Sequence, residues 1–174
     1  PLHVSVAYAY KDAHDLAAVF QGRQPGHVYG RQGNPTTAAL EAKVSAMEGG
    51  VATVSFATGM AAIGAIMLTL TRAGDHVVAS RYLFGSTASR FQTLEAHGGD
   101  VTFVDATDAA AVEAAVTPRT RLVFVETIAN PRTQVADLAG IGEVCARHGL
   151  VYVVDNTMTS PWLFRPSTVG ASLV

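Results

Sequence analysis

The sequence predicts an α/β fold with a mostly parallel sheet flanked by helices. From Thr36 onward, short apolar segments alternate with longer segments in which apolar residues recur at helical spacing. The short segments contain few polar residues, as expected of parallel strands that are buried on both faces. No internal repeat, low-complexity tract or linker divides this part of the chain, so one domain is expected.

The first expected helix takes the segment TTAALEAKVSAMEGG, which begins at Thr36. Leu40, Val44 and Met47 recur at helical spacing and form one apolar stripe. Two glycines follow the stripe, and glycine is common where a helix ends.

The remaining elements follow in order from the same two patterns. Strands are expected in six apolar segments: VATVSF, HVVAS, VTFVD, RLVFVE, LVYVVD and, at the end of the sequence, ASLV. Helices are expected between them, at about residues 58–70, 86–97, 108–116 and 137–148.

Residues 1–35 show no sustained period and contain several glycines and prolines. A long irregular stretch of this kind is usually functional or docks elsewhere, so residues 1–35 are interpreted as an N-terminal arm. Residues 36–174 are interpreted as an incomplete α/β domain, because ASLV begins a strand and no helix follows it.

The composition is that of a soluble globular protein, with 49% hydrophobic residues, 15% charged residues and a net charge of −2. No block of like charge indicates nucleic acid or a membrane surface, and no segment is long and apolar enough to span a bilayer. A cytoplasmic protein is therefore expected. The single cysteine, Cys145, shares an apolar helix face with Leu138 and Ile141, so it is interpreted as buried.

Ligands of open parallel sheets bind beyond the carboxyl ends of the strands, so the residues that follow each strand are the candidate site residues. Thr58, Gly59 and Met60 follow VATVSF at the start of a helix, where free N–H groups can bind a phosphate; an ordinary threonine N-cap is the alternative. Asn130 follows RLVFVE in a possible turn. Asp155 ends LVYVVD, where a buried carboxylate needs a cationic or donor partner, although it could also cap a loop.

Taken in order, these fragments resemble the Cys/Met metabolism family of pyridoxal phosphate enzymes. The resemblance covers essentially the whole chain and is carried by YGRQGNPT, EGGVATVSFATGMAAI, AGDHVVAS, FGST, FVETIANP and VVDNT. It implies pyridoxal phosphate as cofactor and the large domain of a fold-type I, aminotransferase-like enzyme. It also implies a homo-oligomer, expected to be a dimer of dimers.

The resemblance implies roles for the residues at the strand ends. Gly59 and Met60 would donate backbone N–H groups to the cofactor phosphate, with Thr58 at the helix start. Asp155 would bind the pyridine nitrogen and keep it protonated, which makes the ring an electron sink. Asn130 would lie near the ring hydroxyl.

Two further residues lie near the implied cofactor ring. Phe84 would lie over the ring face, where many members carry tyrosine, so stacking is expected without a phenolic proton donor. Glu126 would support the site without contacting the cofactor. Asp155 and Phe84 are thus the expected catalytic residues.

The segment YGRQGNPT is expected to act in another subunit. In the family this segment crosses a dimer interface, so Tyr29 and Arg31 would contact the phosphate held by the neighbour. The planar fork of arginine suits paired hydrogen bonds to phosphate oxygens. A solvated loop is the alternative.

The Schiff-base lysine of the family follows the DNT strand, but the chain contains only Lys11 and Lys43, and neither matches. The lysine is therefore expected just past Val174, together with a C-terminal domain that the given chain lacks.

The phrases ETIANP and DNTMTSPWLFRP resemble homoserine-ester sulfhydrylases most, and Ser86 stands where methionine γ-lyases typically have a reactive cysteine. The expected reaction is replacement of the γ substituent of an O-acylated homoserine by a sulfur nucleophile, as in sulfhydrylases and cystathionine γ-synthases. The alternatives are elimination by a methionine γ-lyase or cystathionine lyase, a degenerate paralogue, and a non-enzymatic phosphate-binding α/β domain. The last has no glycine-rich nucleotide motif in its favour.

Overall fold

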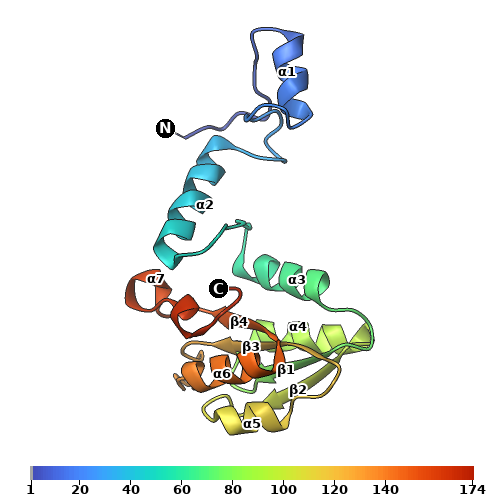
Figure 1. Ribbon diagram of the computed structural model, residues 1–174, viewed down its shortest axis with the longest axis vertical. Helices are drawn as coiled ribbons and strands as arrows, with labels where there is room; N and C mark the ends of the chain where they lie inside the picture. The colour runs from blue at the N-terminus through green and yellow to red at the C-terminus, as the bar shows by residue number, and fades with distance from the viewer. Residues whose placement is uncertain (1) are drawn as a thin grey trace. The chain divides into compact units, whose positions relative to one another are not determined.

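The computed structural model describes residues 2–174 and contains two compact units, the first ending at Ser55 and the second running from Phe56 to Val174. The strands labelled in Figure 1 belong to the second unit, whereas α1 and α2 belong to the first.

The first unit contains helix α1 (Ala13–Phe20), which the sequence analysis missed. The side chain of Asp12 accepts a hydrogen bond from the backbone N–H of Asp15 and so caps the helix. Ala18 and Val19 are its buried residues. The helix is short and buries only these two residues, so no long apolar period marks it in the sequence.

Helix α2 (Pro35–Glu48) confirms the first expected helix. Asn34 caps its start, and Gly49 ends it with φ of 70°, a conformation that favours glycine. The expected apolar stripe is not buried in the first unit, since Leu40 is 55% exposed and Met47 40%.

The expected strand VATVSF is wrong, because residues 51–56 are irregular. Their polar groups bond to side chains of α2 instead of a neighbouring strand. The backbone N–H and hydroxyl of Ser55 both donate to Glu41 at 2.8 Å, and the hydroxyls of Thr53 and Ser45 lie 2.7 Å apart.

The second unit is built on a four-stranded parallel sheet with the order β2-β1-β3-β4. The strands are β1 (His76–Ser80), β2 (Asp100–Val104), β3 (Thr120–Glu126) and β4 (Val151–Asp155). Four of the six expected strands are thereby confirmed. The last expected strand forms only an isolated parallel bridge between Leu173 and Val153, so it lies beside β4 without being a full strand.

Helices cover both faces of this sheet. These are α3 (Gly59–Leu70), α4 (Gly85–Ala96), α5 (Ala109–Ala114) and α6 (Leu138–His148), and all four lie close to the expected positions. Two short helical turns follow β4, namely α7 (Ser160–Leu163) and η1 (Pro166–Val169), and neither was expected.

Alternating residues of the strands point into two separate cores. Val77 packs with Ile63 of α3 and Phe91 of α4. Val78, the next residue of β1, packs with Val112 of α5 and Ile141 of α6 on the opposite face. Such two-sided burial is what makes the strands uniformly apolar in sequence.

The α6 core also contains Cys145, as expected. Burial raises the pKa of its thiol to about 12. The buried-filler interpretation of Cys145 is confirmed.

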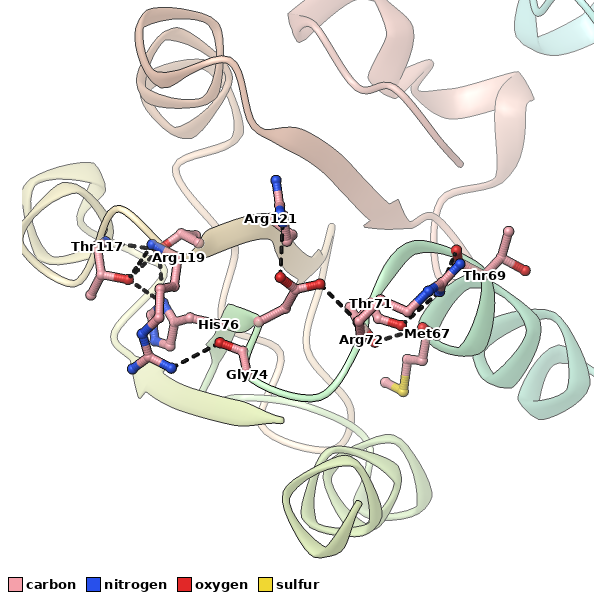
Figure 2. Close-up of polar contacts among 11 residues, drawn as sticks. Met67, Thr69, Thr71, Arg72, Gly74, His76, Thr117, Arg119 and Arg121 are labelled. Carbon is pink, nitrogen blue, oxygen red and sulfur yellow. Dashed lines mark hydrogen bonds and ion pairs between the residues drawn. The ribbon is translucent and has the colours of Figure 1, made fainter. Parts of the chain in front are cut away.

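The amino-terminal edge of the sheet carries a cluster of polar contacts (Figure 2). His76 is buried there, with its two ring nitrogens 2.7 Å from the Thr120 hydroxyl and 2.9 Å from the Thr102 hydroxyl. The guanidinium of Arg121 pairs with Asp75 at 2.9 Å, and Arg72 donates to backbone carbonyls at the end of α3. These contacts stabilise the end of the sheet opposite to its carboxyl edge.

Candidate functional site

A pocket of about 330 Å³ opens at the carboxyl edge of the sheet. It lies where the strand order reverses. The chain passes from β1 to β2 on one side of β1, and then to β3 on the other side. Ligands of open α/β sheets bind at such a point. The lining residues all belong to the second unit: Thr58, Gly59, Met60, Ile63, Phe84, Thr87, Glu126, Ile128, Asn130, Asp155, Thr157 and Met158.

The start of α3 supplies donors for an anion. The hydroxyl of Thr58 accepts a hydrogen bond from the N–H of Ala61 at 3.1 Å and so caps the helix. The backbone N–H groups of Gly59 and Met60 donate to no acceptor among residues 2–174. A Cβ added at Gly59 would meet no atom within 4 Å, so the space beside this backbone is open. Free N–H groups and the helix dipole together favour a negatively charged group here.

Asp155, the last residue of β4, places a carboxylate in the same pocket. Its Oδ1 accepts from the N–H of Thr157 at 3.0 Å and from the hydroxyl of the same residue. Its Oδ2 accepts no hydrogen bond within the described part of the chain. Asp155 is half-buried, so its second oxygen can accept a hydrogen bond from an N–H or O–H group of a ligand.

Glu126, the last residue of β3, connects two loops of the pocket. Its Oε1 accepts from the N–H of Phe84 at 2.6 Å, and its Oε2 accepts from the N–H of Asn130 at 3.2 Å. Burial raises the pKa of this carboxyl; the two backbone N–H groups oppose the shift, and the charge of Asp155 adds to it. Glu126 thus fixes the positions of Phe84 and Asn130 relative to each other.

The remaining walls of the pocket are mainly apolar. The Phe84 side chain is 45% exposed and lies on the loop that leads into α4. Ile63, Ile128 and Met158 complete the apolar surface, while the buried Thr87 hydroxyl lies 3.9 Å from the sulfur of Met60. The pocket therefore offers an aromatic wall, an anion site and, on Asp155, a carboxylate oxygen that accepts no hydrogen bond in the described residues.

Six residues expected at the cofactor line this one pocket: Thr58, Gly59, Met60, Phe84, Asn130 and Asp155. Five further lining residues were not expected from the sequence: Ile63, Thr87, Ile128, Thr157 and Met158. Thr87 stands three residues after Phe84 and so on the same side of the helix start, a spacing that could have indicated it.

Tyr29 and Arg31 belong to the first unit and are exposed. The guanidinium carbon of Arg31 lies 5.6 Å from the centre of the Tyr29 ring, within the range of a cation–π contact. The guanidinium donates to no acceptor among the residues that the structure covers. The adjacent N–H of Gly30 donates to the carbonyl of Val6 at 2.7 Å, which holds this part of the arm on the chain's own N-terminal segment.

Lys11 and Lys43 are both exposed residues of the first unit. Among residues 2–174, no group of His, Cys, Asp and Glu is arranged to hold a metal ion. None of the helices in that range has the length and apolar character needed to cross a membrane.

This arrangement defines a class: an α/β protein with a site for a phosphorylated small molecule at the carboxyl edge of a parallel sheet. Comparison with known proteins is more specific. The chain belongs to the family described as Cys/Met metabolism PLP-dependent enzyme, where PLP is pyridoxal phosphate, and the match covers residues 1–174. The family resemblance of the sequence motifs is thereby confirmed.

Two relatives are similar to the chain at the same level. It is 40% identical to L-methionine gamma-lyase of Pseudomonas putida, over 100% of the chain and 44% of the relative. It is also 40% identical to O-succinylhomoserine sulfhydrylase of Pseudomonas aeruginosa, over 99% of the chain and 43% of the relative. The chain thus spans less than half the length of these relatives, and they differ in activity.

A solved structure supports the fold. The putative O-acetylhomoserine (thiol)-lyase of Campylobacter jejuni matches with a TM-score of 0.89 and 30% identity, over 98% of the chain and 42% of that protein. That structure contains N'-pyridoxyl-lysine-5'-monophosphate. The predicted fold-type I architecture is confirmed.

Proposed function

We propose that the pocket binds pyridoxal phosphate and that the protein replaces the γ substituent of an O-acylated homoserine with a sulfur nucleophile. The observation that supports this most is that six residues expected at the cofactor, from four separate segments of sequence, line one pocket. The family to which the chain belongs supports the cofactor.

The pocket residues fit this cofactor. The phosphate suits the start of α3, where the N–H groups of Gly59 and Met60 have no other acceptor. The flat ring suits the Phe84 side, and the unbonded Oδ2 of Asp155 suits a protonated ring nitrogen. When bound, pyridoxal phosphate stabilises negative charge at the α carbon of an amino acid.

The residues of the chain have distinct tasks in such a site. Asp155 holds a proton on the ring nitrogen, because an ion pair favours the charged form of both partners. Glu126 keeps Phe84 and Asn130 in place through their backbone N–H groups. Phe84 excludes water from one ring face and, lacking a hydroxyl, moves no proton. We assign the Schiff base to neither Lys11 nor Lys43.

The choice of γ-replacement rests on Ser86, which stands where methionine γ-lyases typically have a reactive cysteine, and on similarity to sulfhydrylases. Elimination is the second candidate, because a methionine γ-lyase is equally similar at 40% identity. Assembly is part of the proposal. In a homo-oligomer, Tyr29 and Arg31 of the arm (residues 1–35) contact the phosphate bound by the neighbouring subunit's domain, which begins at residue 36.

The cofactor is tested by absorption of the full-length protein. The purified protein is expected to be yellow and to lose this absorption on treatment with hydroxylamine. Asp155→Ala is expected to abolish turnover with little effect on folding, whereas the matched variant Asp108→Ala, at the exposed cap of α5, retains turnover. A colourless full-length protein would refute the cofactor assignment.

The reaction is tested by kcat/KM for O-acetyl- and O-succinylhomoserine with sulfide, compared with that for methionine cleavage. The acyl esters are expected to be preferred. Preference for methionine by tenfold, about 1.4 kcal/mol in transition-state free energy, would overturn γ-replacement in favour of elimination.

The arm is tested by mixing two inactive variants, Arg31→Ala and Asp155→Ala. If the arm acts in a neighbouring subunit, some mixed oligomers contain a site with both residues intact, and activity returns in part. Subunit exchange without recovered activity would contradict the proposal.

A further inference from the structure

A second pocket, of about 290 Å³, adjoins the first at the carboxyl edge of the sheet. Asn130 lines both pockets, and Leu83 of the second pocket is followed in the chain by Phe84 of the first. The second pocket is formed by the loops after β1 and β3, the two loops that Glu126 joins.

Two arginines give this pocket a positive charge. Arg81 and Arg132 both line it, and neither guanidinium donates to an acceptor in the described residues. The hydrogen bond to Asp105 raises the pKa of the Tyr82 hydroxyl, and the positive charges of both arginines oppose that shift.

Asp105, the acidic residue beside Arg81, does not satisfy the arginines. Its Oδ1 accepts from the N–H of Thr107 at 3.0 Å and from the Thr107 hydroxyl at 2.7 Å, while its Oδ2 accepts from the Tyr82 hydroxyl at 2.8 Å. Both oxygens of Asp105 are thus already engaged by other donors, and neither arginine forms an ion pair with it in the described residues. The pocket retains a net attraction for an anion.

Amide side chains add hydrogen-bonding capacity beside the arginines. Asn130 is exposed at the boundary of the two pockets, and only its backbone N–H is engaged, by Glu126. The Oε1 atom of Gln134 is buried and accepts no hydrogen bond in the described structure. The exposed side-chain amide of Asn130 can donate hydrogen bonds to an anion.

We propose that the second pocket binds the terminal carboxylate of the acyl group when the substrate is a dicarboxylic ester of homoserine, such as O-succinylhomoserine. The inference rests on the proposed function, because it places the γ substituent in the first pocket. Guanidinium groups form paired, charge-assisted hydrogen bonds with carboxylates. An acetyl ester has no terminal carboxylate and gains nothing from Arg81 and Arg132, so these residues determine acyl specificity.

The kinetic test uses the full-length protein with sulfide and the two acyl esters. Arg81→Gln/Arg132→Gln is expected to lower the ratio of kcat/KM for the succinyl ester to that for the acetyl ester at least tenfold. Arg90→Gln, at an exposed arginine of α4 that lines neither pocket, is the matched control and leaves the ratio unchanged. A ratio that does not change in the double variant would overturn the inference.

A binding test does not depend on turnover. Monoethyl succinate carries an ester at one end and a carboxylate at the other, whereas diethyl succinate carries no charge. Calorimetric titration is expected to show that monoethyl succinate binds the wild-type protein and Arg90→Gln equally, and the double variant at least tenfold more weakly. Diethyl succinate is expected to bind none of them. Restoring charge with Arg81→Lys/Arg132→Lys is expected to recover part of the affinity.

The two tests separate two kinds of failure. If neither acyl ester is turned over but methionine is, the proposed function is wrong, while arginine-dependent binding of monoethyl succinate still supports a carboxylate site. If the acyl esters are substrates but binding is the same in wild type and double variant, the second pocket has no such role. A change in the double variant that affects both esters equally would also overturn the acyl specificity.

Discussion

Replacing His76 by leucine is expected to reduce stability in a way that depends on pH. The ring is buried, and its two nitrogens contact hydroxyls of Thr120 and Thr102. Leucine fills a similar volume but loses both hydrogen bonds, each of which contributes about 0.5–1.5 kcal/mol. Thr102 is exposed and Thr120 still accepts from the N–H of Thr117, so no hydroxyl is left without a partner. The expected cost near pH 7 is therefore about 2 kcal/mol.

The pH dependence follows from the direction of the His76 pKa shift. Burial lowers its pKa; Asp100, in β2, acts against this shift, and Arg119, before β3, acts with it. Because the folded-state pKa lies below the unfolded value of about 6.5, the unfolded state binds more protons in the interval between them. The contribution of neutral His76 to the free energy of unfolding is complete above about pH 6.5 and is lost as pH falls toward the folded-state pKa. The leucine variant loses no such contribution, so its deficit shrinks on acidification.

Amide hydrogen exchange in β1 of the full-length protein measures this effect locally. The free energies of opening at Val77 and Val78 are compared at pH 7 and pH 5.5, after correction for the intrinsic exchange rates. The difference between wild type and His76→Leu is expected to be smaller at pH 5.5. The exposed His97→Leu, at the end of α4, serves as control and shows no change. A difference that stays constant or grows at pH 5.5 would refute the reasoning.

Three other predictions concern single residues. Gly142→Ala is expected to destabilise the protein by at least about 1–3 kcal/mol, because its Cβ would clash with the backbone carbonyl of Val169. Gly64→Ala, at a position of α3 where an added Cβ meets no atom within 4 Å, is expected to stabilise the protein by up to about 1 kcal/mol. Thermal unfolding is expected to show a lower Tm for the first variant and a higher Tm for the second. Cys145 is expected to resist iodoacetamide at pH 8 until the protein unfolds, because it is buried and its pKa is raised to about 12; rapid labelling of the native protein would contradict this. Thr58→Ala is expected to weaken α3 by about 1 kcal/mol and to reduce cofactor retention, measured by dialysis against buffer without pyridoxal phosphate; Thr58→Ser, which keeps the hydroxyl, should restore both.

The sequence predicted the second unit well because its strands and helices carry strong local patterns. Uniformly apolar segments, such as the one around Val123, are buried on both faces and stand out in any sequence. The same criterion failed for residues 51–56, where Val51 is fully exposed and Val54 is 71% exposed. Apolar content alone does not distinguish a buried strand from an extended segment whose polar groups bond to a neighbouring helix.

The site was predictable to the extent that its residues directly follow strands or begin a helix. Thr58, Asn130 and Asp155 occupy such positions, and family motifs gave them roles. The contact of Glu126 with the backbone of Phe84 could not be predicted, because it joins residues 42 positions apart. The second pocket was missed for the same reason, since Arg81 and Arg132 come together only through the pairing of β1 with β3.

The bridge made by Glu126 has a consequence for motion. A single carboxylate accepts from the loop after β1 through one oxygen and from the loop after β3 through the other. Neither loop can swing outward without leaving a buried acceptor unsatisfied, which is costly. The two loops should therefore open together, so that the amides of Phe84 and Asn130 exchange with similar opening free energies. Any ligand that orders one loop would order the other, so binding in one pocket would also order the walls of the other pocket.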